Sequence, residues 1–335
     1  MKAYELQGNF GIDSLTLTER PEPQHGAGQV LLKMRAWSLN YRDLMVVKGT
    51  YHPNLRLPFT PLSDGVGEVV AVGEGVSRVK TGDRVAGIFM QKWIDGQLTE
   101  VKAMSALGGA SAGLAAEYVV LDAEGVVPIP EHLTDEEGAT LPCAAVTATH
   151  ALVYAGNIQA GETVLIQGTG GVSLFALQFA RALGARVIAT SSSDVKLARV
   201  HQLGASEGIN YKTTPEWGDR ARELTGGTGV DHVVEVGGSG TFAQSLRAIR
   251  MGGRISLIGI LSGVGPVDPL PILMKGVCVQ GIFVGSRAMF ETMNAALVLH
   301  ELRPIVDKVF PFGELREALR HMESGSHFGK IVLRR

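Results

Sequence analysis

Between residues 163 and 258 the chain repeats one pattern: a short apolar run, a turn rich in glycine or serine, and apolar residues at helical spacing. In the first repeat the run 164–167 is followed by a glycine turn and by apolar residues three and four positions apart, up to Leu183. Later apolar runs also read as strands, and they are 186–190, 208–211, 231–236, 254–258 and 277–284. Six strands joined by helices predict a doubly wound α/β fold with a parallel sheet.

The glycine turn after the first of these strands gives the pattern a chemical meaning. A strand, a glycine turn and a buried helix together hold a nucleotide pyrophosphate against N–H groups at the helix start. The residues expected to bind it are Gly168, Thr169, Gly170, Gly171 and Val172. Open α/β sheets bind ligands at the carboxyl ends of their strands, and the candidates at later strand ends are Gly237, Gly259, Val284 and Gly285. We therefore expect a Rossmann nucleotide-binding domain.

The chain before residue 126 has a different pattern. Short alternating runs are separated by Gly, Pro and Asp turns, which predicts a mostly antiparallel β domain; they are 29–36, 67–72, 84–89 and 116–121. After residue 300, two more strand-like runs flank a helical one. We expect this tail to complete the β domain, so that residues 1–125 with 301–335 form one domain and residues 126–300 the other.

Composition and charge narrow the functional classes. The formal net charge of −2 gives no general attraction to nucleic acid or to an anionic membrane. The N-terminus has no apolar core of a signal peptide, and we expect no membrane association. Two cysteines, Cys143 and Cys278, are too few for a disulfide scaffold. These features predict a cytoplasmic protein.

Several motifs occur in one order along the chain: 62–69 (LSDGVGEV), 79–85 (VKTGDRV), 113–119 (GLAAEYV), 141–148 (LPCAAVTA) and the glycine turn. In this the chain resembles the medium-chain dehydrogenase/reductase superfamily. It is most similar to the zinc-independent, quinone oxidoreductase-like branch, whose members are often labelled alcohol dehydrogenases. The resemblance implies a GroES-like fold for the β domain and a nicotinamide cofactor.

The zinc positions of the superfamily are not filled by zinc ligands. In zinc-dependent relatives a Cys near residue 40 and a His before a Glu bind the catalytic metal, whereas this chain has Asn40 and the pair Ser63-Asp64. Only Cys143 remains, and one thiolate does not make a catalytic site of three protein ligands. Residues 91–115 also lack the cysteines of a structural zinc lobe. We expect no zinc.

The resemblance assigns the catalytic candidates. It places Asn40 and Tyr51 in the nicotinamide pocket, with Thr147 beside the ring. Without a metal, neutral hydrogen-bond donors can stabilise the developing oxyanion, and the Tyr51 phenol could protonate it. The alternative is that Tyr51 packs in a loop and that water protonates the substrate.

The end of the second strand bears on the choice of cofactor. NAD-specific folds place a carboxylate there, but this chain has Ser191 and Ser192, with Lys196 one helical turn further on. By resemblance, Tyr211 lies beside the adenine ribose phosphate and Lys330 approaches the cofactor. NADP(H) is favoured over NAD(H). In the alternatives, Asp194 takes the acidic position and Lys330 is solvated.

These observations predict an NADPH-dependent reductase of a small electrophile: a quinone, an α,β-unsaturated carbonyl, an aldehyde or a ketone. A metal-free reversible alcohol dehydrogenase is the second enzymatic hypothesis. A non-catalytic NADPH sensor, or an RNA-binding protein similar to zeta-crystallin, is a hypothesis of another class. The apolar run 277–284 would lie at a sheet edge, and we expect a homodimer through that edge.

Overall fold

The computed structural model describes residues 1–51 and 54–335. They divide into two compact units: Met1–Val146 with Val284–Arg335 form unit 1, and Thr147–Phe283 form unit 2. Unit 1 extends beyond the domain bounds expected from the sequence. One reason is that strand β7 (Val126–Pro128) pairs with β5 (Arg84–Gly87). Helix α10 (Arg287–Leu299) also belongs to this unit, and its Asn294 side chain donates to the Pro128 carbonyl at 3.0 Å.

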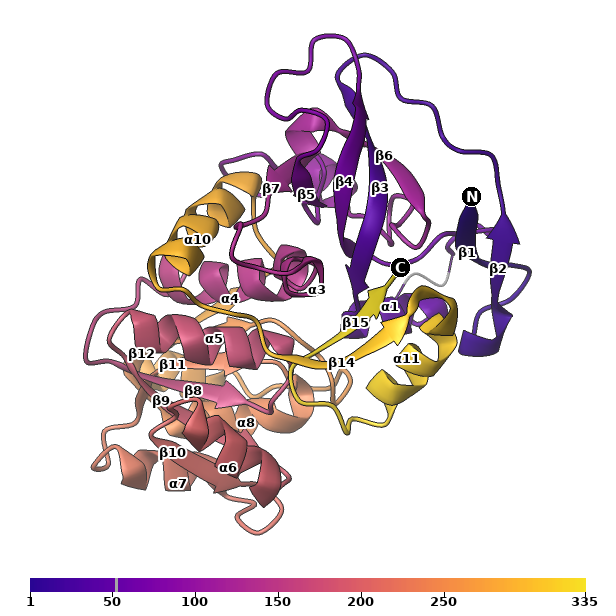
Figure 1. Ribbon diagram of the computed structural model, residues 1–335. Helices are drawn as coiled ribbons and strands as arrows, with labels where there is room; N and C mark the ends of the chain where they lie inside the picture. Colours follow the sequence, from indigo (N-terminus) through magenta and orange to yellow (C-terminus); the bar gives the residue numbers. More distant parts are fainter. Residues whose placement is uncertain (52–53) are drawn as a thin grey trace. The chain divides into compact units, whose positions relative to one another are not determined.

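Unit 2 is built on a parallel sheet in the order β10-β9-β8-β11-β12-β13 (Figure 1). Its strands are β8 (Thr163–Gln167), β9 (Arg186–Ser191), β10 (Glu207–Asn210), β11 (Val230–Glu235), β12 (Ile249–Leu257) and β13 (Cys278–Gly281). This order confirms the predicted doubly wound fold. The strand order reverses between β8 and β11, so the carboxyl ends of these two strands flank the switch point where such folds bind ligands.

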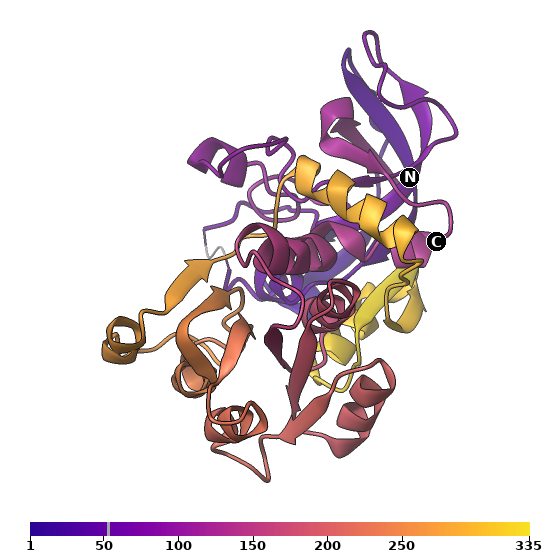
Figure 2. The same cartoon turned by 90° about the vertical axis from the view of Figure 1, so that its left-hand side faces the viewer.

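Helices cover both faces of this sheet because successive side chains of each strand point to opposite sides. Leu165 of β8 joins a core with Phe242 and Leu246 of α8, while Val164 and Ile166 face the other way. The helices are α4 (Val146–Thr149), α5 (Gly171–Ala182), α6 (Asp194–Gln202), α7 (Trp217–Leu224), α8 (Ser239–Ala248) and α9 (Leu270–Lys275), with a π-helical turn at His150–Tyr154. At one edge β13 pairs with β12, with α9 nearby (Figure 2).

Unit 1 contains a mostly antiparallel sheet and a separate hairpin of β1 (Lys2–Leu6) and β2 (Leu15–Glu19). The long strand β3 (Gln29–Ser38) pairs with β4 along one side. Its other side pairs first with β6 and then, near its end, with β15. The remaining strands of the sheet are β4 (Asp64–Val72), β6 (Tyr118–Asp122), β14 (Val306–Pro311) and β15 (Lys330–Arg334).

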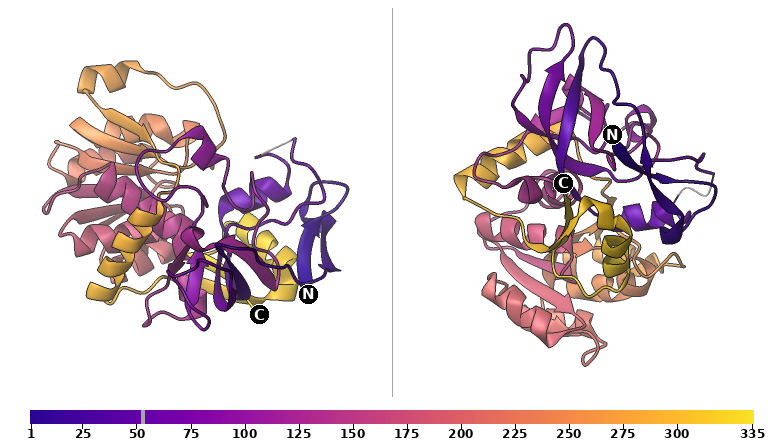
Figure 3. Two further views of the ribbon diagram at one scale, coloured as in Figure 1. Left: turned by 90° about the horizontal axis from the view of Figure 1, so that it is seen from above. Right: turned by 45° about the vertical axis from the view of Figure 1, so that its right-hand side comes forward.

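The C-terminal tail returns to this sheet, as the sequence predicts. β15 runs antiparallel to β3, with Val332 opposite Ser38, and β14 lies parallel to β15 (Figure 3). Phe312 stacks on Trp37 at 4.2 Å between ring centroids, which joins the tail to the core. The other helices of unit 1 are α1 (Tyr41–Val47), α2 (Glu100–Ala103), α3 (Asp135–Gly138) and α11 (Leu315–Glu323), with short turns at Ile12–Ser14, Ala123–Gly125, Leu141–Ala145 and Phe312–Glu314. None of the helices in the described ranges has the length and apolar character needed to span a membrane.

Candidate active site

The predicted glycine turn joins β8 to α5 in unit 2. Gly168 has a φ of 69°, a left-handed conformation that glycine adopts without a steric cost, and no atom lies within 4 Å of the place a Cβ would take. Helix α5 has twelve residues and begins after Gly170, and no side chain in the described part of the chain caps its first N–H groups. A helix N-terminus of this kind binds phosphate, so the turn fits a dinucleotide.

The carboxyl ends of β8 and β11 are joined by a buried polar network. Glu235 ends β11 with its side chain fully buried, and Gln167 ends β8. The donors to the Glu235 carboxylate are Gln167 Nε2 at 2.6 Å, the hydroxyls of Thr241 and Ser245, and the N–H groups of Gly237 and Gly238. Neither Glu235 nor Gln167 is singled out by the sequence patterns. The available signal was a carboxylate at the end of an apolar strand, two residues before a glycine pair.

The other strand-end candidates lie in different surroundings. A Cβ on Gly259 would lie 2.4 Å from the Val236 carbonyl oxygen, so the turns after β11 and β12 pack too closely for any side chain. Strand β13 ends at Gly281, earlier than the predicted strand 277–284. Val284 and Gly285 consequently begin the return of the chain into unit 1.

The residues predicted for the adenosine end gather after β9 and β10. The Ser191 hydroxyl accepts the N–H of Ser193, which in turn caps α6 by accepting the N–H of Lys196. The Tyr211 N–H donates to the Ser191 carbonyl at 3.0 Å, which brings the turn after β10 beside that after β9. Ser192 and Lys196 are half-buried and Tyr211 is exposed. This group of side chains contains hydroxyls and a cation.

Asp194, the acidic alternative, already has a partner. Its carboxylate accepts the side-chain N–H of Asn210 at 2.8 Å, and it stands in the first turn of α6. A carboxylate stabilises that helix terminus through the helix dipole. These contacts account for Asp194 without a role at the ribose.

A polar cluster in unit 1 brings Asn40 and Lys330 together. Lys330 begins β15 and is only 4% exposed. Its Nζ donates to the Asn40 Oδ1 and to the Leu39 carbonyl, each at 2.5 Å. The predicted role of Lys330 at the cofactor remains a prediction, but in this structure its ammonium is bonded within the cluster.

The positions that correspond to zinc ligands lie in the same cluster. Asn40 Nδ2 donates to the Ser63 hydroxyl at 3.4 Å, and that hydroxyl donates to Asp64 Oδ1 at 2.7 Å. The other oxygen of Asp64 accepts the N–H of Cys143 at 3.0 Å. Burial, and then the neighbouring Asp64, raise the pKa of the Cys143 thiol well above its usual range. Burial also raises the pKa of Asp64, and Lys330 opposes that shift.

Tyr51 lies beside Arg42 at the edge of this cluster. The Arg42 guanidinium carbon is 5.7 Å from the Tyr51 ring centroid and 4.4 Å from that of Phe89. Burial raises the pKa of Tyr51, while the Arg42 charge lowers it. A phenol with a raised pKa keeps its proton at neutral pH, so Tyr51 can act as a hydrogen-bond donor.

Asp43 links Arg42 to Asn40. Its side chain is fully buried, accepts the Asn40 N–H at 2.8 Å and lies 3.4 Å from an Arg42 guanidinium nitrogen. Burial raises its pKa from 3.8 to about 6, although the charge of Arg42 acts in the opposite direction. The Arg42–Asp43 pair was not among the site residues predicted from sequence, because nothing local shows that both side chains are buried.

Thr147, the third catalytic candidate, belongs to α4 and lies in unit 2, where it is buried. The structure thus joins Asn40 with Lys330 in unit 1, with Tyr51 near Arg42, and collects the nucleotide candidates of unit 2 at its strand ends. The catalytic roles remain predictions.

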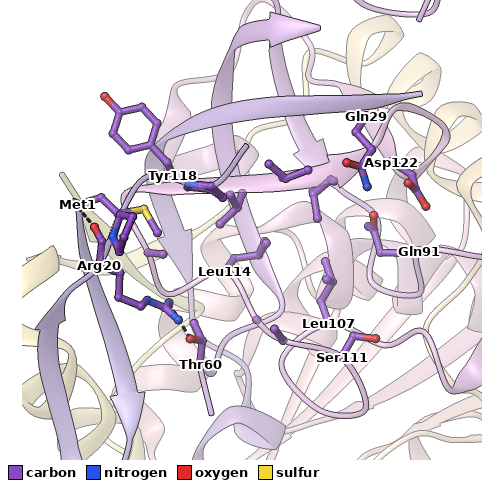
Figure 4. A pocket seen from close by; sticks show the side chains of 18 residues that line it. Met1, Arg20, Gln29, Thr60, Gln91, Leu107, Ser111, Leu114, Tyr118 and Asp122 are labelled. Carbon is purple, nitrogen blue, oxygen red and sulfur yellow. Dashed lines mark hydrogen bonds between the residues drawn. The ribbon is translucent and has the colours of Figure 1, made fainter. Parts of the chain in front are cut away.

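Unit 1 also contains a cavity of about 560 Å³, which none of the predicted site residues lines. Arg20 and Thr60, hydrogen-bonded at 3.0 Å, lie at one end of it, and Gln29, Gln91 and Asp122 lie at the other (Figure 4). Strand β6 forms one wall.

The comparisons with known proteins agree with this architecture. The family model "Alcohol dehydrogenase GroES-like domain" matches residues 26–131, and "Zinc-binding dehydrogenase" matches residues 171–298. A zinc-type alcohol dehydrogenase-like protein of Schizosaccharomyces pombe is 46% identical, over 97% of this chain and 96% of its own length. The chain belongs to the medium-chain dehydrogenase/reductase superfamily. As in other members, this identity makes it an NAD(P)-dependent oxidoreductase.

Other superfamily members differ in their named activities. Human quinone oxidoreductase is 30% identical, over 91% of this chain and 88% of its own length. A solved NAD-dependent alcohol dehydrogenase is 33% identical with a TM-score of 0.91, and each chain is covered completely. A mycobacterial protein solved with NADPH is 29% identical with a TM-score of 0.84, again over both full chains. The two solved relatives are thus named with nicotinamide cofactors, one with NAD and the other with NADPH.

The raised pKa of Asp43 predicts a pH dependence of stability. A carboxyl whose pKa is raised on folding contributes stability below its unfolded pKa and loses that contribution as the pH rises through its folded pKa. Asp43→Asn removes the titration but keeps an oxygen for the Asn40 N–H. Relative to this variant, we expect the wild-type free energy of unfolding to fall by about 2.5 kcal/mol between pH 4 and pH 7.5.

Urea denaturation of both proteins over that pH range measures the difference. Other titrating groups are common to the two proteins and cancel. A difference that stays constant with pH would show that Asp43 is ionised in the folded protein throughout.

Proposed function

We propose that this oxidoreductase is an NADPH-dependent, zinc-independent reductase of small electrophiles: quinones, α,β-unsaturated carbonyls, or related aldehydes and ketones. The observation that carries the proposal is the polar cluster around Asn40 and Lys330. Its members are a buried ammonium, an amide, a hydroxyl, a buried carboxyl and one thiol.

This donor set does not fit a catalytic zinc ion. Thiolates and imidazoles are the ligands that zinc prefers, and of these the cluster offers only the side chain of Cys143. The Lys330 ammonium, 2.5 Å from Asn40 Oδ1, would repel a divalent cation. Within residues 1–51 and 54–335, no group of three His, Cys, Asp or Glu side chains has the arrangement of a metal site.

The same cluster supports reduction without a metal. A bound nicotinamide would supply a hydride, and negative charge would then develop on the substrate oxygen. Tyr51, protonated at neutral pH because burial raises its pKa, can donate a hydrogen bond or a proton to that oxygen. The adjacent Arg42 guanidinium adds a positive charge.

The preference for NADPH rests on the turn after β9. Ser191, Ser192 and Lys196 offer hydroxyls and a cation to a 2′-phosphate, and Asp194 is engaged by Asn210. The mycobacterial relative solved with NADPH is consistent with this preference, whereas another solved relative is NAD-dependent.

Turnover with a substrate panel tests the proposed function. We expect NADPH oxidation with at least one quinone, enal or ketone, and no loss of rate after treatment with a zinc chelator. Tyr51→Phe should lower kcat by about 100-fold, because general acid catalysis contributes at least that much. Absence of turnover with every class, or a rate that depends on added zinc, would refute the proposal. Product analysis separates C=C reduction from the alcohol formation expected of an alcohol dehydrogenase.

Lys196→Gln tests the cofactor preference. Loss of one charge-assisted contact should raise the Kd for NADPH by about 10- to 100-fold and leave the Kd for NADH nearly unchanged. Arg199→Gln, one turn further along the same helix, is the matched control and should affect neither. Titration of cofactor fluorescence gives the Kd for NADPH and the Kd for NADH of the wild type and of both variants. Equal weakening of both cofactors by Lys196→Gln would assign Lys196 to a part of the dinucleotide that NADH and NADPH share.

We also propose that unit 2 forms a homodimer through the edge of its sheet. In β13, Cys278, Gln280 and Gly281 are exposed, which leaves a strand edge available for pairing. Large apolar side chains surround that edge: Val264 is 85%, Leu273 76% and Met274 67% exposed. An apolar surface beside an open strand edge favours association with a second copy.

Sedimentation velocity at micromolar concentration should give the mass of two chains. Leu273→Glu should shift the protein to the monomer, whereas Leu299→Glu, an equally exposed leucine on α10 of unit 1, should not. A monomeric wild-type protein would contradict the proposal.

A further inference from the structure

Lys330 is buried where a cation needs specific support. Its ammonium comes from the first residue of the last strand and reaches the two residues that follow β3. Ile331 fixes this approach, because its carbonyl accepts the N–H of Leu39 at 2.9 Å. In the described part of the chain, no carboxylate oxygen lies within 4.0 Å of the Lys330 Nζ. The two carbonyl oxygens of Leu39 and Asn40 are therefore its close partners.

This contact contributes to the orientation of the Asn40 amide, together with Asp43 on its oxygen side and with Ser63 and Asp64 on its nitrogen side. A side-chain amide has an oxygen that only accepts and a nitrogen that only donates. Because the ammonium occupies Oδ1, Nδ2 must lie on the opposite side, where the Ser63 hydroxyl accepts from it at 3.4 Å. The Asn40 main chain is fixed separately, since its N–H donates to Asp43. Lys330 thus supplies the charged contact on the oxygen side of the amide, where the Asp43 N–H of the helix cap also lies.

The ammonium also polarises the amide. A cation bonded to an amide oxygen draws electron density toward that oxygen and makes the N–H groups stronger donors. The nearby carboxyl of Asp64 accepts from Ser63 and from the Cys143 N–H, and the Lys330 charge lowers its pKa against the effect of burial.

We propose that Lys330 is a positioning residue of the reductase site, which holds Asn40 with Nδ2 as a polarised donor and does not bind the cofactor. This inference rests on the proposed function for its kinetic consequences, but the orientation of the amide can be measured without turnover.

The kinetic test combines Lys330→Met with Asn40→Asp. The carboxylate introduced by Asn40→Asp would keep an oxygen for the ammonium and lose the donor, so that variant should fold like the wild type. Each single variant should lower kcat by about 10- to 100-fold, the usual effect of removing a residue that orients a functional group. The double variant should be no slower than Asn40→Asp alone, because both changes remove the same donor. The Kd for NADPH should change less than twofold in all three.

Lys275→Met is the matched control. Lys275 is also a partly buried lysine that donates to main-chain carbonyls, of Leu246 and Ile249 among others, but it belongs to unit 2, whereas the cluster belongs to unit 1. The Lys275→Met variant should have a lower free energy of unfolding than the wild type and an unchanged kcat. Two results would overturn the inference: losses that multiply in the double variant, or a Kd for NADPH that rises in Lys330→Met by as much as kcat/KM falls.

Selective ¹⁵N-asparagine labelling supplies a measurement that does not depend on turnover. The side-chain amide protons of Asn40, assigned from Asn40→Asp, should be shifted and slow to exchange in the wild type. In Lys330→Met they should exchange at least tenfold faster, while those of Asn210 do not change. Unchanged Asn40 protons would refute the positioning role. If they change as expected but the wild type reduces no substrate, the proposed function fails and the orientation by Lys330 stands.

Discussion

The burial of the Lys330 ammonium is the constraint on which the polar centre of unit 1 depends. An ammonium removed from water is costly unless polar groups surround it, and here the carbonyl oxygens of Leu39 and Asn40 do so. These oxygens become available only because β15 pairs antiparallel with the end of β3. The pairing of β15 with β3 and the orientation of the Asn40 amide, a predicted catalytic group, therefore depend on each other. Loosening either one disturbs the other.

Unit 2 buries a carboxylate where unit 1 buries an ammonium. There the buried charge is the Glu235 carboxylate, and side-chain and main-chain donors converge on it from β8, α8 and the turn after β11. A carboxylate with several donors holds a turn in one conformation, since displacing any donor would leave part of the charge unsatisfied. The turn that it fixes, 236–238, stands at the switch point beside the glycine turn. Both units therefore place a hydrogen-bonded buried charge next to the residues that sequence patterns assign to binding or catalysis.

The sequence predicted what local patterns encode. Apolar runs, glycine turns and helical spacing located all six strands of the parallel sheet, and Gly168 marked the turn between β8 and α5 because strand, turn and helix are contiguous. Contacts between residues far apart in the sequence could not be predicted from such patterns. Asn40 and Lys330, for example, are 290 positions apart, and no periodicity links them. Burial was equally hidden, so Asp43 and Glu235 read as ordinary polar residues. The unit bounds shifted because residues 126–146 pack by tertiary contacts that composition does not reveal.

The electrostatics of the cluster connect two parts of the proposed function. Arg42 and Lys330 lie there beside the carboxyl groups of Asp43 and Asp64, whose pKa values burial raises while the two cations lower them. The Lys330 ammonium on Asn40 Oδ1 disfavours a divalent cation at that oxygen, since the repulsion scales with charge. The Arg42 guanidinium beside the Tyr51 ring favours an oxyanion that develops there, because a fixed charge in a dry environment acts without reorganisation. On the proposed function, the cations of this cluster would stabilise the oxyanion in place of a metal.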